Sequence, residues 1–176
     1  MSFVIFLDID GVLNTDEYIQ KADTDPTEKP RTHIDPERVK HLNNILEVCP
    51  KNTQVVLTST WKKEFNEQEM TKILQDQGFR GTVDDTAISI REPAAGYGSF
   101  STRRELREQT VRHHLKQNPE IECFLIIDDY PTTRAPEDVW LEGQLEYLIY
   151  TNGEGLQNQH VKEVEIRNYT EQTPGG

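Results

Sequence analysis

Polar, oxygen-bearing side chains follow three apolar runs of the sequence, each at the point where the run ends. Asp8-Ile9-Asp10 follows the first run, Thr58-Ser59-Thr60 the second, and Asp128-Asp129 the third. Because ligands of open α/β sheets bind outside the carboxyl ends of the strands, we expect these three clusters to meet in one crevice. Four carboxylates gathered there would repel one another, and oxygen-only ligands suit a hard ion such as Mg²⁺. The sequence therefore predicts a divalent metal site.

Each cluster taken alone has a simpler structural interpretation. An Asp-X-Asp-Gly turn after a strand is often only a cap and a turn, and Thr58 or Ser59 can cap the element that follows. Adjacent aspartates are also common on protein surfaces. It is the occurrence of all three clusters behind three apolar runs that favours a shared site.

The apolar pattern also predicts the elements that must position these clusters. Strands are expected at residues 2–8, 54–57, 121–127 and 147–150. Helices are expected at residues 36–48 after an Asp35 cap, from an Asn66 cap to Gly78, from a Ser101 or Thr102 cap to before Pro119, and at residues 156–164. Strands that alternate with helices predict right-handed crossovers. We therefore expect an α/β fold of three layers, with a Rossmann-like, mostly parallel sheet and helices on both faces.

Two stretches are less clearly patterned. Residues 87–90 form a possible short strand inside the weakly patterned stretch 81–100. Residues 15–33 form a polar loop too long for a simple connection after a strand, and a loop of that length beside a strand end is a candidate functional flap.

The length and charge of the chain restrict the classes of protein that it can belong to. Its 176 residues are enough for one domain, expected over residues 1–168, with a loose tail at 169–176. A formal net charge of −12 argues against a general nucleic-acid coat protein, although a bound cation can still hold a nucleic-acid end locally. The sequence has neither a transmembrane run nor a signal peptide, so we expect a cytoplasmic protein with no membrane partner. Cys49 and Cys123 lack the spacing of a zinc site.

Three of the motifs resemble those of a known superfamily. Residues 6–14 (FLDIDGVLN) resemble the first motif of the haloacid dehalogenase (HAD) superfamily of phosphohydrolases, 55–58 (VVLT) the second, and 126–129 (IIDD) the fourth. Residues 58–62 (TSTWK) are similar to the Ser-Ser-X-Trp-Arg stretch of a small capless branch, which includes polynucleotide 3′-phosphatase domains associated with RNA repair. The resemblance runs from residue 3 to about residue 161. It implies a fold without a large cap domain.

The resemblance also implies roles for single residues. Asp8 would be the nucleophile that forms an aspartyl-phosphate, and Asp10 the general acid and base. Asp8, Asp128, Asp129 and the backbone carbonyl of Asp10 would hold Mg²⁺, while Thr58 would hydrogen-bond a phosphoryl oxygen.

The cation of the third motif is less defined. Arg107, in residues 107–115 (REQTVRHHL), aligns with a helix of the capless branch, although Thr110 and His114 depart from its usual Glu and Trp. Arg103 and Arg104 compete with Arg107 for this role, and all three can instead form a solvated basic face. Lys62 stands where the branch has Arg, which predicts a second phosphate contact without bidentate geometry.

Aromatic residues and histidines near these motifs have structural alternatives. Trp61 follows a buried strand, so it either packs in the core or stacks on a base. His113 and His114 are adjacent on a helix and point in different directions, which disfavours joint metal ligation.

The stretches outside the motifs bear on the substrate. Neither residues 15–33 nor residues 81–100 are long enough for a folded cap, so we expect an open site. The resemblance then implies a phosphorylated substrate, with a polynucleotide 3′-phosphate end or a nucleotide as the leading candidate. Small metabolites or phosphoproteins, hydrolysed by the same chemistry, are alternatives, and so is a noncatalytic interaction protein of this fold. The sequence leaves the oligomeric state open.

Overall fold

A parallel sheet of five strands forms the centre of the protein. The computed structural model describes residues 2–23, 33–93 and 105–167. The strands are β1 (Ser2–Leu7), β2 (Gln54–Leu57), β3 (Asp85–Thr86), β4 (Ile121–Asp128) and β5 (Leu148–Tyr150), in the order β3-β2-β1-β4-β5. All four strand pairs are parallel, so every strand ends at the same edge of the sheet. The predicted α/β fold is confirmed.

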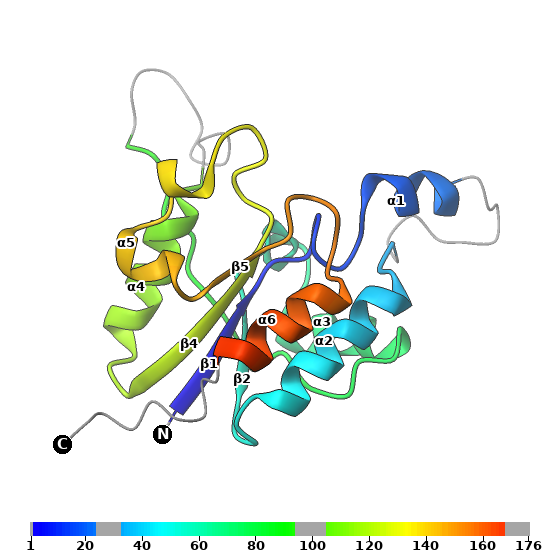
Figure 1. The fold of residues 1–176 in the computed structure, drawn as a ribbon, viewed down its shortest axis with the longest axis horizontal. Coiled ribbons are helices and arrows are strands. Elements are labelled where there is room, and N and C mark those ends of the chain that lie inside the picture. Colours follow the sequence, from blue (N-terminus) through cyan, green and yellow to red (C-terminus); the bar gives the residue numbers. More distant parts are fainter. Residues whose placement is uncertain (1, 24–32, 94–104, 168–176) are drawn as a thin grey trace.

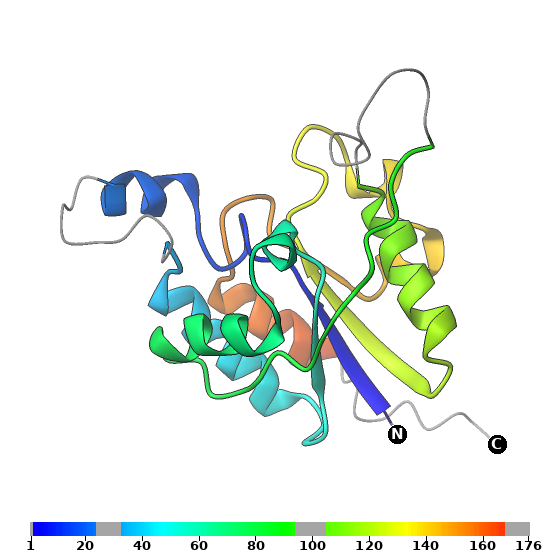
Figure 2. The same ribbon diagram turned by 180° about the vertical axis from the view of Figure 1, so that it is seen from behind.

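Helices cover both faces of this sheet (Figures 1 and 2). On one face lie α2 (Pro36–Val48), α3 (Glu67–Asp76) and α6 (Asn158–Arg167), whereas α4 (Arg107–Gln117) and α5 (Glu142–Leu145) lie on the other. Successive side chains of a strand point to opposite faces. Accordingly, Phe3, Ile5 and Leu7 belong to the larger apolar cluster, and Val4 and Phe6 to the smaller one. Burial on both faces explains why β1 reads as a continuous apolar run.

Side-chain caps start two of these helices where the sequence predicts. The Asp35 carboxylate accepts a hydrogen bond from the Glu37 backbone N–H over 2.9 Å, and Pro36 occupies the first turn of α2. Asn66 and Glu69 form a reciprocal capping box at the start of α3. Gly78 lies one residue beyond the C-cap of α3, with φ of 95°, a backbone conformation that glycine adopts at little cost.

Three expectations about secondary structure are wrong. The stretch 15–33 is not all loop, because α1 (Asp16–Asp23) forms within it; residues 24–32 lie outside the described residues. Residues 87–90 are not a strand, and the pairing with β2 ends at Thr86. Helix α4 does not begin near residue 101, since Leu106 is its N-cap with extended backbone, and Glu105 bridges to Arg91. The alternative cap residues 101 and 102 lie outside the described part.

Short helices fill connections that carry no clear periodicity. These are the 3₁₀ helices η1 (Thr60–Lys63) and η3 (Pro136–Asp138), together with the single turn α5. The expected tail at residues 169–176 lies outside the described residues. No helix within the described ranges is long and apolar enough to cross a membrane.

Candidate active site

The strand register brings the three predicted clusters together. The Asp8 N–H donates to the carbonyl of Ile127 over 3.0 Å, and the Thr58 N–H donates to the carbonyl of Leu7 over 2.9 Å. The ends of β2, β1 and β4 are therefore level, and the loops that follow them gather at one end of the sheet (Figure 1). One carboxylate oxygen each of Asp8, Asp128 and Asp129 lies within 4.8 Å of the others.

One guanidinium group contacts two of these carboxylates. The Nη1 atom of Arg107 lies 3.2 Å from Oδ1 of Asp8 and 2.9 Å from Oδ2 of Asp128. All three side chains are secluded, with 4% of Asp8, 0% of Asp128 and 12% of Arg107 exposed to solvent. Arg107 is the first residue of α4, so the same helix that covers the sheet face delivers a cation to the strand ends.

The carboxylates nevertheless carry more negative charge than one guanidinium can balance. Burial raises the pKa of Asp128 well above its ordinary value, although Arg107 opposes the shift. Burial, with Asp8 close by, raises the pKa of Asp129 to about 7. A divalent cation would restore the ionised forms, and a compact set of carboxylate oxygens is the donor set that Mg²⁺ prefers. The residues present therefore fit the predicted metal.

The turn after β1 brings its backbone against the acidic cluster. Gly11 has φ of 74°, and a Cβ atom at this position would collide with the carboxylate of Asp129. The Gly11 carbonyl accepts hydrogen bonds from Oγ1 of Thr151 over 2.8 Å and from the backbone N–H of Gly155 over 3.1 Å. The turn that carries Asp8 and Asp10 is thus fixed by the loop after β5, and glycine is required in it.

Asp10 occupies the rim of the site. Its side chain is exposed and accepts hydrogen bonds from the indole Nε1 of Trp61, at 3.1 Å to Oδ1 and 3.2 Å to Oδ2. The amide Nδ2 of Asn14 donates to the same Oδ1 over 3.1 Å. Trp61 also packs against the larger apolar cluster, so its ring is partly core, and its polar edge reaches the predicted general acid.

Thr58 and Lys62 follow β2, which flanks β1 on the side opposite to β4. Within the described residues, Oγ1 of Thr58 is buried and has no hydrogen-bond partner, which leaves it available to a ligand. The ammonium of Lys62 lies 3.3 Å from the Thr58 carbonyl and 3.2 Å from Oε1 of Glu105. Burial lowers the pKa of Lys62, and Glu105 opposes that shift. Lys62 is thus at the site but is held by a carboxylate.

Not every candidate can be placed at the site. Arg103 and Arg104 lie outside the described residues. His114 is buried, with its ring edge-on to Phe6 at a centroid distance of 5.4 Å, so it is a core residue. His113 points in a different direction from His114 and lines a pocket on the outer side of α4, as their adjacency predicts.

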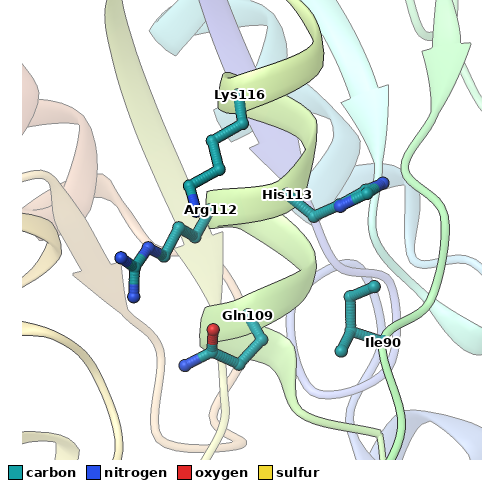
Figure 3. A pocket seen from close by; sticks show the side chains of 5 residues that line it. All are labelled: Ile90, Gln109, Arg112, His113 and Lys116. Atoms are coloured by element: carbon teal, nitrogen blue, oxygen red, sulfur yellow. The ribbon is translucent and has the colours of Figure 1, made fainter.

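The outward face of α4 is hollowed. Ile90, Gln109, Arg112, His113 and Lys116 line a pocket of about 150 Å³ there (Figure 3). The four helical residues recur at the three- and four-residue spacing that places side chains on one face. Among the described residues, the ion pairs of α4 are those of Arg107, and neither Arg112 nor Lys116 forms one there.

Two contributors to the site were not singled out from sequence. Asn14 is a buried polar residue directly after an apolar pair, and its Oδ1 accepts from the Gly11 N–H over 3.0 Å. A buried amide four residues beyond Asp10 is a detectable feature, because such a group requires nearby hydrogen-bond partners. Glu105 gives no comparable indication, since its partners Lys62 and Arg91 are distant in sequence.

The all-parallel, Rossmann-like sheet with aspartates gathered at its strand ends defines a HAD core. The family model described as the HAD domain in Swiss Army Knife RNA repair proteins matches residues 4–161, and the chain belongs to this family. Comparison with curated proteins and with solved structures gave no significant match.

Proposed function

We propose that the protein is an Mg²⁺-dependent phosphomonoesterase that removes the 3′-phosphate from a polynucleotide end. The observation that carries this proposal is the buried cluster of Asp8, Asp128 and Asp129 around Arg107, in a domain of an RNA-repair family. A purely structural role gives no reason to bury several carboxylates around one cation, because burying charges is costly.

The reaction would proceed in two displacements. In the first, a carboxylate oxygen of Asp8 bonds to phosphorus as the bond to the leaving oxygen breaks, and Asp10 gives that oxygen a proton. In the second, Asp10 takes a proton from water, the water oxygen bonds to phosphorus, and the bond to Asp8 breaks. Inorganic phosphate leaves, and both aspartates return to their starting forms.

The cationic and hydroxyl groups of the site would hold the phosphoryl group. Arg107 is our candidate for the cation of the third motif, because its guanidinium touches Asp8. The unpartnered hydroxyl of Thr58 would donate to a phosphoryl oxygen. Lys62 would contribute positive charge beside Thr58, held in place by Glu105.

Asp8, Asp128, Asp129 and the backbone carbonyl of Asp10 would hold Mg²⁺. When bound, the ion supplies positive charge that offsets the repulsion between the nucleophile and the phosphate.

Two features favour a polynucleotide over a small metabolite. Asp10 is exposed at the rim, so a phosphate on a large molecule can approach it. The outward face of α4 offers Arg112 and Lys116 in a protein of net charge −12, and such cations bind the phosphates of a nucleic-acid strand. We propose that this face contacts the substrate strand beyond the terminal phosphate.

Phosphate release tests the proposal. A 3′-phosphorylated oligoribonucleotide, its 5′-phosphorylated counterpart, a phosphopeptide and p-nitrophenyl phosphate would each be incubated with wild type and with Asp8→Asn, in Mg²⁺ or EDTA. We expect Mg²⁺-dependent release, fastest from the 3′-phosphate and absent in Asp8→Asn. Faster release from the phosphopeptide would overturn the substrate assignment. Absence of release from all four substrates by a folded, Mg²⁺-binding protein would overturn the catalytic proposal in favour of a noncatalytic role.

A further inference from the structure

The indole of Trp61 is positioned by contacts that do not involve substrate. Ser59 caps η1, with its Oγ accepting from the Trp61 backbone N–H over 3.3 Å, so the helix begins immediately after the Thr58 strand end. The ring then packs against Phe65 at a centroid distance of 5.9 Å. The backbone and the ring of Trp61 are therefore both fixed, and the indole N–H has a defined direction.

That direction is toward the carboxylate of Asp10. The Oδ1 atom of Asp10 accepts from both Trp61 and Asn14, whereas Oδ2 has only the longer contact with Trp61 among the described residues. An indole N–H donates only, and so does the Nδ2 group of Asn14. Oδ1 therefore accepts from two donors and Oδ2 shares one of them, so Oδ2 keeps the greater capacity to carry a proton.

We propose that Trp61 is a positioning residue that orients Asp10 so that Oδ2 transfers the proton to the leaving oxygen. This inference rests on the proposed phosphatase function. Without the indole contact, Asp10 would lie on an exposed rim where, among the described residues, Asn14 is its remaining side-chain donor. The proton donor would then occupy its productive orientation for less of the time. Trp61 itself transfers nothing, so its effect is limited to steps in which Asp10 moves a proton.

The dependence on leaving group separates positioning from a structural role. A ribose hydroxyl is a poor leaving group and needs a proton as the bond to phosphorus breaks, whereas p-nitrophenolate departs as an anion. Trp61→Phe keeps the ring against Phe65 and removes the N–H. Phe65→Leu is the graded comparison, because it removes the ring contact that holds Trp61 and leaves the indole donor in place.

The experiment measures the single-turnover rate of leaving-group release from a 3′-phosphorylated oligonucleotide and from p-nitrophenyl phosphate. We expect Trp61→Phe to slow release from the oligonucleotide about 10-fold, as a fraction of the usual contribution of general acid catalysis, with KM and the p-nitrophenyl phosphate rate nearly unchanged. Asp10→Asn should show the same selectivity more strongly, and Phe65→Leu, which loosens the ring but keeps the N–H, should show a smaller selective loss than Trp61→Phe. Thermal melting confirms that each variant is folded.

An equal effect of Trp61→Phe on both substrates, or no effect on either, would overturn the positioning role while leaving the phosphatase proposal intact. Failure of wild type to release phosphate from either substrate would overturn the proposed function and this inference with it. Trp61→His offers a second variant should Trp61→Phe not fold, since it keeps an aromatic ring but shortens it, which withdraws the N–H from Asp10. It should reproduce the selective loss on the oligonucleotide, and equal losses on both substrates would again contradict the inference.

Discussion

The two faces of helix α4 carry cations in opposite environments. On the inner side, Arg107 is secluded and touches the carboxylates of Asp8 and Asp128. On the outer side, Arg112 and Lys116 are exposed beside the pocket of Figure 3, with no ion pair among the described residues. The partners of a buried cation fix its position and orientation, whereas exposed cations are screened by solvent and salt and can change their orientation.

This contrast divides chemistry from recognition. Under the proposed function, Arg107 would act on any substrate that brings a phosphate to Asp8, because its guanidinium contacts that carboxylate. Arg112 and Lys116 can act only on a substrate long enough to reach the outward face. Removing the inner cation should therefore affect every substrate, and removing the outer pair should affect only long ones.

Arg107→Ala tests the inner face and should have the largest effect. We expect kcat/KM to fall about 100-fold or more on both p-nitrophenyl phosphate and the oligonucleotide, as is typical when a charge-stabilising donor is removed. In the metal-free protein the change also leaves buried carboxylates unpaired, which should lower the free energy of unfolding by about 3 kcal/mol. Steady-state kinetics and urea unfolding in EDTA measure the two effects.

Arg107→Lys is the control for this prediction, because it keeps a positive charge without the planar fork. It should fall between wild type and Arg107→Ala in both measurements. Wild-type rates in Arg107→Ala would show that the cation of the third motif lies elsewhere.

The pH dependence of metal binding tests the charge balance of the inner site. The pKa of Asp129 rises from 3.8 to about 7, so between these values the native metal-free protein binds more protons than the unfolded chain. The contribution of Asp129 to stability should therefore fall as the pH rises across that window, against the opposite contribution of His41, His114 and His160, whose pKa values burial lowers. Mg²⁺ requires ionised ligands. The increase in melting temperature on adding Mg²⁺ should therefore be larger at about pH 8 than at about pH 5.

Thermal melts of Asp129→Asn provide the comparison for this experiment. The substitution removes the titrating group, so the decline of metal-free stability over this window should become shallower. The same dependence of stability on pH in wild type and in Asp129→Asn would contradict the account of the inner site.

The double variant Arg112→Ala/Lys116→Ala tests the outer face and should have the smallest effect. We expect kcat/KM to fall about 10-fold on the oligonucleotide, with a weaker dependence on salt concentration, and to stay unchanged on p-nitrophenyl phosphate. Lys40→Ala/Lys72→Ala changes the net charge equally on helices of the other sheet face. Equal losses in the two double variants would indicate a general charge effect and remove the outward face from the substrate path.

Much of the fold could be predicted because its determinants are local. The continuous apolar run of β1, the Asp35 cap of α2 and the capping box of Asn66 each specify an element within a few residues. The convergence of Asp8, Thr58 and Asp128 follows from parallel strands that end at one edge. The placement of Asp8, Thr58 and Asp128 in the site therefore depended on fold class alone.

The remainder depends on contacts between distant segments. Helix α4 begins at Arg107 because Glu105 is drawn into a bridge with Arg91, and no local capping signal reports that pairing. The contact between Trp61 and Asp10 joins residues far apart in sequence, and propensity carries no information about it. Helix α1 is not predicted because its residues are mostly polar and show no apolar periodicity, so its acidic first turn alone does not indicate a helix.

The central claim is that Asp8 carries the phosphoryl group during turnover. An oligonucleotide with a radiolabelled 3′-phosphate would be mixed with enzyme and Mg²⁺, quenched in acid, and the protein assayed for label that hydroxylamine releases. We predict transient labelling of wild type and none of Asp8→Asn. Labelling of Asp10→Asn should form slowly, because the leaving oxygen is not protonated, and should then persist, because water is not activated. Phosphate release by Asp8→Asn at the wild-type rate, or label on another residue, would contradict the account.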